Sequence, residues 1–124
     1  MKVQDILNRI DELKPSSFSK NTLIGWLSEL DGRISSEVMG AYKYAASGGG
    51  YSTDNLNTEL LLPDEYSNIY IYYLQAQMDY FNGEMTRYQN AMLMFNTAFR
   101  DFQNQYNRTH EAWEERISTS LDGM

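Results

Sequence analysis

The chain has 124 residues, which is a typical size for one domain, and 42% of them are apolar. Its 17 acidic and 10 basic residues give a formal net charge of −7. This balance excludes a protein whose main role is to grip the nucleic-acid backbone, because that role needs an excess of Lys and Arg. Because the chain has no cysteine, it can form neither a disulfide framework nor a Cys-ligated zinc site. No apolar run reaches the roughly 18–20 residues that cross a bilayer, and no signal-peptide pattern follows Met1, so we expect a soluble intracellular protein.

The charge is unevenly distributed along the chain. Residues 1–50 carry six acids and six bases, whereas residues 51–124 carry eleven acids and four bases. From Tyr51 to Thr86 there are six acids and no base. This asymmetry indicates one neutral and one acidic surface, and an ordinary solvated surface that happens to be acidic is the simpler interpretation.

The amino-terminal third predicts two amphipathic helices. The first ends before Pro15, because the residue preceding a proline is disfavoured in the α region. Its apolar face consists of Val3, Ile6, Leu7, Ile10 and Leu13. Ser19 is the expected N-cap of the second helix, and Phe18 before it is placed to pack onto Leu23 as a hydrophobic staple. The second apolar face consists of Leu23, Leu27, Leu30, Ile34 and Val38, with Trp26 at its flank.

A glycine-rich segment separates this half from the rest. The second helix is expected to fade between Gly40 and Tyr44, and the glycines at 48–50 open a polar loop that extends to Asn57. Three successive glycines can cradle a phosphate group, but no Walker-type Lys-Ser/Thr pair follows them. We therefore interpret this segment as a long mobile loop.

A third helix is expected from Pro63 to about Asn82, since proline suits the first helical position and the acids at 64 and 65 complement the helix dipole. Its main apolar face consists of Tyr66, Ile69, Tyr70, Tyr73, Leu74, Gln77, Met78 and Phe81. A second stripe consists of Ile71, Tyr72, Gln75, Ala76, Asp79 and Tyr80. This second stripe is too apolar for an ordinary solvated face, so something covers it. The candidate subunit-contact residues are Ile71, Tyr72, Ala76 and Tyr80.

Asn82-Gly83 is a turn signal, because both residues tolerate positive φ. A fourth helix is expected from Glu84, with a heptad-like apolar seam of Met85, Tyr88, Met92, Phe95, Phe99, Phe102 and Tyr106. Because the same spacing continues backwards through Phe81, Met78 and Leu74, two arrangements are open. One is a single long helix that tolerates Gly83, and the other is an αα-hairpin that turns there. We favour the hairpin, which buries both stripes against each other.

The last segment, from His110 to Leu121, places Trp113, Ile117 and Leu121 four residues apart. It predicts a short amphipathic helix or a tail that orders on a partner. The whole pattern predicts an all-α fold of about four helices with a C-terminal αα-hairpin, a long Gly-rich loop and a short C-terminal tail helix. We divide it into a helical domain at 1–110 and a tail at 111–124.

No catalytic constellation emerges from the sequence. His110 is the single histidine, and in His110-Glu111-Ala112-Trp113-Glu114 a glutamate occupies the second ligand position of the zincin pattern. A ferritin-like metal site needs repeated Glu-x-x-His pairs, and Ser–His–acid catalysis has no nucleophile-elbow glycine pattern to present it. We expect no enzyme activity, no catalytic or metal-binding residues and no cofactor.

Five segments of the chain carry a recognisable pattern, and they are DILNRI (5–10), WLSELDGRI (26–34), LPDEY (62–66), YIYYLQAQMDYFNGE (70–84) and RYQNAMLMFNTAFRDFQNQYNRTH (87–110). Together they resemble the small head-to-tail connector (adaptor) proteins of tailed phages and prophages of Gram-positive bacteria. The resemblance covers about residues 3–110. It is a pattern of helix stripes rather than a catalytic signature.

The resemblance implies a non-enzymatic virion protein of the neck, made in the cytoplasm of the host bacterium. Such subunits form a ring, commonly twelvefold, beneath the portal protein. The ring extends the DNA channel, through which DNA passes without specific binding, and it docks further neck and tail proteins without involving a membrane. The acidic stretch at 51–86 then faces either that channel or solvent. Residues after His110 lie outside the resemblance, and our own hypothesis is that the tail reaches the portal through Trp113, Arg116, Ile117 and Leu121.

A second interpretation belongs to a different class. A small intracellular helical adaptor or regulator would bind a single host protein through its aromatic hairpin. The connector interpretation predicts a ring that assembles with the portal protein, whereas this alternative predicts a 1:1 complex with a host protein.

Overall fold

The computed structural model describes residues 1–39 and 50–122, with side chains described for residues 1–37 and 50–109. Within these ranges all the named secondary-structure elements are helical, so the all-α prediction is confirmed. The helices are α1 (Val3–Leu13), α2 (Lys20–Ile34), α4 (Ser67–Phe81) and α5 (Met85–Asp122). A π-helical turn, η1 (Ser35–Met39), continues α2, and a 3-10 turn, η2 (Asp64–Tyr66), precedes α4. The glycines expected to form the mobile loop lie outside the described residues.

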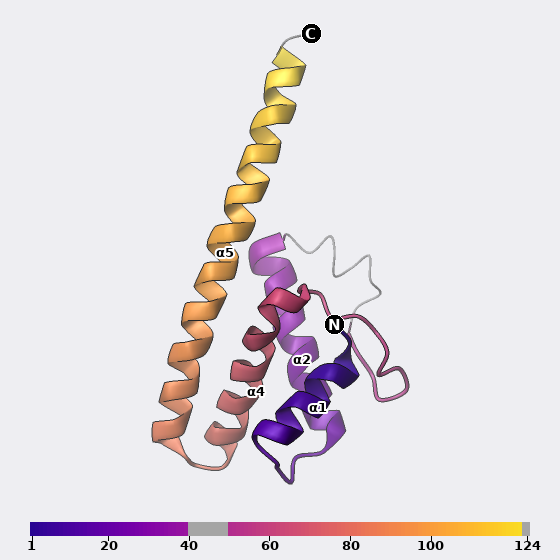
Figure 1. Cartoon of the computed structure of the whole chain (residues 1–124), viewed down its shortest axis with the longest axis vertical. Coiled ribbons are helices and arrows are strands. Elements are labelled where there is room, and N and C mark those ends of the chain that lie inside the picture. The colour runs from indigo at the N-terminus through magenta and orange to yellow at the C-terminus, as the bar shows by residue number, and fades with distance from the viewer. Residues whose placement is uncertain (40–49, 123–124) are drawn as a thin grey trace.

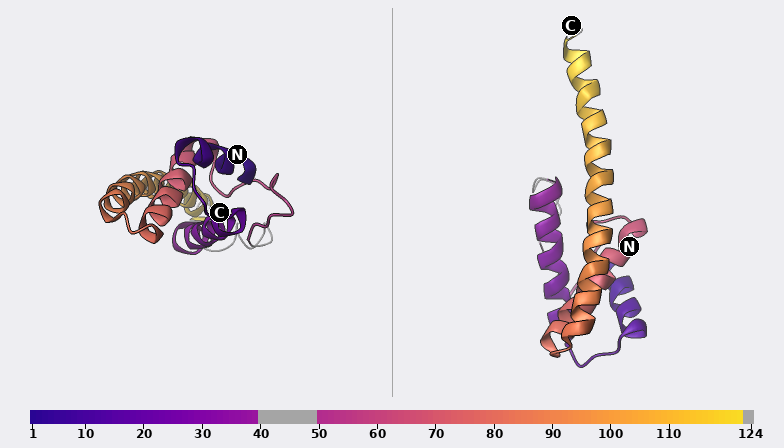
Figure 2. Two further views of the ribbon diagram at one scale, coloured as in Figure 1. Left: turned by 90° about the horizontal axis from the view of Figure 1, so that it is seen from below. Right: turned by 90° about the vertical axis from the view of Figure 1, so that its left-hand side faces the viewer.

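Helix α4 occupies the centre of the fold. It packs against α5 on one side and against α1 and α2 on the other (Figure 1). Helix α5 has 38 residues and is about 57 Å long at 1.5 Å per residue, whereas α4 has 15 residues. The carboxyl half of α5 therefore projects well beyond the other helices, as Figure 1 and the right-hand view of Figure 2 show.

The two amino-terminal helices form largely as their periodicity predicts. Buried apolar residues of α1 are Val3, Ile6, Leu7 and Ile10, but Leu13 is 48% exposed and does not belong to the core. Ser19 caps α2, because its side-chain oxygen accepts a hydrogen bond from the Thr22 N–H at 3.2 Å, and this prediction is confirmed. The ring of Phe18 contacts Trp26 edge-on, with centroids 5.4 Å apart. The side chain of Val38 lies outside the described set.

The start of the third helix differs from the prediction. Pro63 does not occupy the first position of an α-helix; it precedes the 3-10 turn η2, in which the Tyr66 N–H bonds to the Pro63 carbonyl at 2.9 Å. Helix α4 begins only at Ser67. A 3-10 turn is common at the amino end of an α-helix, and residue types alone do not separate the two.

The second stripe of the third helix also requires a correction. Ile71 is 4% exposed and Ala76 is 1% exposed, so both side chains are buried inside the chain itself. The reason is the central position of α4, which neighbouring helices of the same chain cover on more than one side. Of the four candidate subunit-contact residues, Tyr72 is half-buried and only Tyr80, at 51% exposure, lies largely on the surface.

Helices α4 and α5 are joined by a short turn at Gly83, whose φ is +75°, and they run antiparallel (Figure 1). Their interface is aromatic: the ring centroids of Tyr73 and Phe95 are 5.4 Å apart, and those of Tyr66 and Phe102 are 5.0 Å apart. Helix α5 continues without a break to Asp122, so the tail at 111–122 extends this helix rather than forming a separate one. The side chains of Trp113, Arg116, Ile117 and Leu121 lie outside the described set.

Two glycines provide a matched test of the turn. Gly83 has a left-handed φ and nothing within 4 Å of the position where a Cβ would lie, so G83A should lower the free energy of unfolding by about 1 kcal/mol through backbone strain alone. Gly25 lies exposed inside α2 and is equally unobstructed, so G25A should raise it by about 1 kcal/mol. Urea unfolding of both variants measures the two shifts. Shifts of the same sign would contradict the turn geometry.

Candidate functional site

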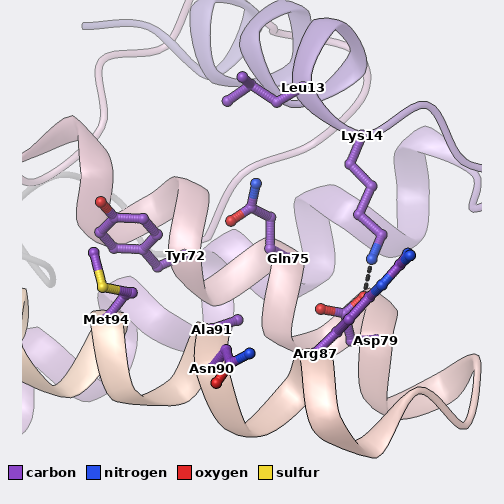
Figure 3. A pocket seen from close by; sticks show the side chains of 9 residues that line it. All are labelled: Leu13, Lys14, Tyr72, Gln75, Asp79, Arg87, Asn90, Ala91 and Met94. Atoms are coloured by element: carbon purple, nitrogen blue, oxygen red, sulfur yellow. Dashed lines mark ion pairs between the residues drawn. The ribbon is translucent and has the colours of Figure 1, made fainter.

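A groove of about 400 Å³ lies between the end of α1, the middle of α4 and the first turns of α5 (Figure 3). Its apolar lining residues are Leu13, Tyr72, Ala91 and Met94. Its polar lining residues are Lys14, Gln75, Asp79, Arg87 and Asn90. Leu13 is 48% exposed and Met94 is 49% exposed, so the groove offers apolar side chains to a partner.

An ion-pair cluster occupies one end of the groove. Lys14 follows the last turn of α1, and its Nζ pairs with Asp79, a residue of α4 that is 3% exposed (Figure 3). Lys14 also lies 3.5 Å from Glu84, which in turn pairs with Arg87 at 3.4 Å. Two cations therefore face two carboxylates, and the cluster has no net charge with which to hold an ion. Its role is to tie α1 to the turn between α4 and α5.

A second hollow, of about 340 Å³, lies between α1 and the segment that leads into α2. Its lining includes Asn8, Asp11, Lys14, Ser16 and Lys20. The charges of Lys14 and Lys20 face only one carboxylate here, that of Asp11. The other lining residues include both polar and apolar side chains, and together they do not form a recognisable catalytic arrangement.

A buried polar network is the chemical feature that sequence analysis missed. Asp31 is fully buried on α2 and accepts hydrogen bonds from the Tyr70 hydroxyl at 2.7 Å, the Leu61 N–H at 3.2 Å and the Tyr51 hydroxyl. The Tyr70 hydroxyl accepts a further bond from the Leu62 N–H at 2.9 Å. A signal was present: Asp31 follows Leu27 by four residues, which places an acid on the apolar face of the helix.

The environment of this network perturbs its titration. Burial raises the pKa of the Asp31 carboxyl group above its usual range, although hydrogen bonds from Tyr51, Tyr70 and the Leu61 amide oppose the shift. Burial raises the pKa of Tyr70 as well, and the neighbouring Asp31 charge adds to the effect. Neither of the two hollows described above is lined by these residues, so the network has no adjoining space for a substrate there.

Exposed apolar side chains gather at the turn between α4 and α5. Tyr80, Phe81 and Met85 are 51%, 60% and 44% exposed, and we call them the turn patch. The Phe81 ring stacks on Trp26 of α2, with centroids 5.7 Å apart and planes inclined by 8°. The turn patch is therefore held against the core at one edge and open to solvent at the other. Of the candidate subunit-contact residues, Tyr72 lines the groove and Tyr80 belongs to the turn patch.

In the part of the chain that the structure describes, no group of three or more His, Cys, Asp or Glu side chains is arranged to hold a metal ion. None of the described helices is both long enough and apolar enough to span a membrane. His110 lies in α5, and its side chain is outside the described set.

Comparison of the chain with protein-family models, with curated proteins and with solved structures gave no match.

The ion pair between Lys14 and Asp79 provides a second prediction, which concerns the stability of the fold. In K14M the buried Asp79 carboxylate loses its main partner, and we expect the free energy of unfolding to fall by about 2–3 kcal/mol, because Lys14 is partly exposed and the cost for a fully buried pair is about 3–5 kcal/mol. The double variant K14M/D79L removes both charges and should recover most of that loss. Urea unfolding of the two single variants and the double variant completes the cycle. A double variant that loses the sum of the single effects would show that the pair is not coupled.

Proposed function

We propose that the chain is a non-catalytic structural subunit that forms an oligomeric ring at the head–tail junction of a tailed-phage virion, beneath the portal protein. The ring would extend the DNA channel and dock neck or tail-completion proteins. DNA would pass without specific binding, in agreement with the formal charge of −7. This proposal places the protein in the virion neck after synthesis in the host bacterial cytoplasm.

The observation that carries the proposal is the presence of two different apolar surfaces on one small chain. The groove presents Leu13 of α1 and Met94 of α5, whereas the turn patch lies against Trp26 of α2. Head-to-tail contacts in a ring are heterologous, so each subunit needs two unlike surfaces that complement each other. Surfaces that combine exposed aromatic and Met side chains are typical of protein interfaces.

The shape of the chain also supports an assembly role. The carboxyl half of α5 extends beyond the packed helices (Figure 2), and such a projection adds contact area without adding to the core of the same chain. We assign the end of this helix, including Trp113, Arg116, Ile117 and Leu121, to contact with the portal. The expected ring is twelvefold, the number implied by the resemblance.

The test is assembly with purified portal protein, followed by light scattering and electron microscopy. We expect a ring of the chain on the portal, and we expect M94K in the groove or Y80K in the turn patch to weaken ring formation at least tenfold in the concentration required. N96K is the matched control, because Asn96 is exposed on α5 but belongs to neither apolar surface. A chain that stays strictly monomeric both alone and with portal would overturn the proposal.

Deletion of residues 111–124 tests the portal contact separately. We expect the truncated chain to lose portal binding, and unchanged binding would contradict the assignment of the tail. A 1:1 complex with one host protein, lost in Y80K but not in N96K, would instead favour the adaptor alternative, because the turn patch belongs to the aromatic hairpin.

A further inference from the structure

The segment from Tyr51 to Leu62, which we call the strap, joins the two halves of the fold. Near its start, the Tyr51 N–H donates to the Ser28 side chain at 2.9 Å and the Tyr51 hydroxyl donates to Asp31. At its end, the Leu61 N–H donates to Asp31 at 3.2 Å, and the Leu62 N–H donates to the Tyr70 hydroxyl at 2.9 Å. Both ends of the strap therefore converge on the same buried carboxyl group.

The middle of the strap serves the first helix. The Val3 N–H bonds to the Thr58 carbonyl and the Gln4 N–H bonds to the Leu56 carbonyl, both at 3.0 Å. These amides belong to the first turn of α1, where no carbonyl of the same helix can accept them. Detachment of the strap would leave them without these partners, so the state of the strap is coupled to the start of α1.

The groups around Asp31 make its ionisation costly. The titratable side chains that face it are Tyr51 of the strap and Tyr70 of α4, and both are neutral hydrogen-bond donors. None of the ion pairs found among residues 1–37 and 50–109 includes Asp31. A fully buried carboxylate that depends on neutral donors is less stable than one in water or beside a cation.

We propose that Asp31 is a proton-dependent latch, which holds the strap on α2 and α4 while the carboxyl group is protonated and releases it more readily when the group ionises. In the docked state the Tyr51 hydroxyl and the Leu61 N–H still donate to one oxygen of the protonated carboxyl group. The proton on its other oxygen is donated to the Tyr70 hydroxyl oxygen, in place of the bond that Tyr70 donates to the ionised group. In the released state water reaches the carboxylate and stabilises its charge. The latch is a property of this fold, and it does not depend on the proposed function.

The direction of the effect follows from linkage. Burial raises the pKa of Asp31 in the docked state, whereas the released carboxyl group has the ordinary value of about 3.9. The stabilising contribution is therefore complete below the ordinary value, and it declines as the pH rises towards the raised pKa and levels off above it.

Amide hydrogen exchange of the full chain, measured by NMR between pH 3 and pH 8, tests the latch. After correction for intrinsic exchange rates, we expect the protection of the Leu61 and Leu62 amides to fall by up to tenfold per pH unit between the two pKa values of Asp31. The Leu74 amide in the core of α4 is the internal reference for global unfolding. In D31N the fall in protection should disappear, because the side chain at position 31 no longer ionises.

A second variant keeps the test decisive if D31N does not fold. Y51F removes one bond that stabilises the ionised carboxyl group, so the pKa of Asp31 should rise. The chemical shift of the Asp31 carboxyl carbon in NMR measures this pKa. The loss of protection at the strap amides should then extend to higher pH. Y66F is the matched control, because the Tyr66 ring contacts Phe102 rather than Asp31. Three outcomes would overturn the proposal: protection of the strap that ignores pH while Asp31 titrates, the same fall in D31N, or an equal fall at Leu74.

Discussion

The arrangement of the amino-terminal helices depends on how one buried carboxyl group is satisfied. Asp31 sits on the core face of α2, where burial of an unpaired acid would cost several kcal/mol. Its partners come from three places in the chain: Tyr51, the Leu61 amide and Tyr70 of α4. Because all three must reach the same two oxygens, the network fixes the position of α4 relative to α2 and holds the intervening strap against both.

Such a constraint also helps to set how α4 is rotated about its own axis relative to the helices that pack against it. Apolar side chains around α4 would also pack in shifted positions, since hydrophobic contact is not directional. The bond from Tyr70 to Asp31, at 2.7 Å, orients α4, and Ile71 and Ala76 are buried in this orientation. The ion pair from Lys14 to Asp79 acts in the same way in the last turn of α4, where it holds α1. Two polar contacts thus set the orientation of a largely apolar body.

Much of the fold was predictable from local pattern, and the errors have a common physical origin. The cap at Ser19 depends on neighbouring residues only, and so does the conformation of Gly83. The buried network at Asp31 depends on a bond between residues 39 positions apart, and the burial of Ile71 and Ala76 depends on helices that lie far from α4 in the sequence; periodicity reports neither. The groove was missed for the same reason, since α1, α4 and α5 all contribute to it.

The same constraints determine which parts of the chain remain for partners. Ile71 and Ala76, which the sequence pattern assigned to a subunit contact, are buried because α4 is central, and exposed apolar side chains remain in the groove, in the turn patch and at Leu93 of α5. A few acids take part in contacts within the chain: Asp31 and Asp79 are buried, and Glu59 and Asp64 pair with the Met1 amino group. The pair of Asp79 with Lys14 leaves the formal net charge of −7 unchanged, because both charges are already counted in it. Among the described residues Asp31 and Asp79 are the only buried acids, so the acidic composition is carried mainly by exposed side chains, and this exposed charge opposes a grip on DNA.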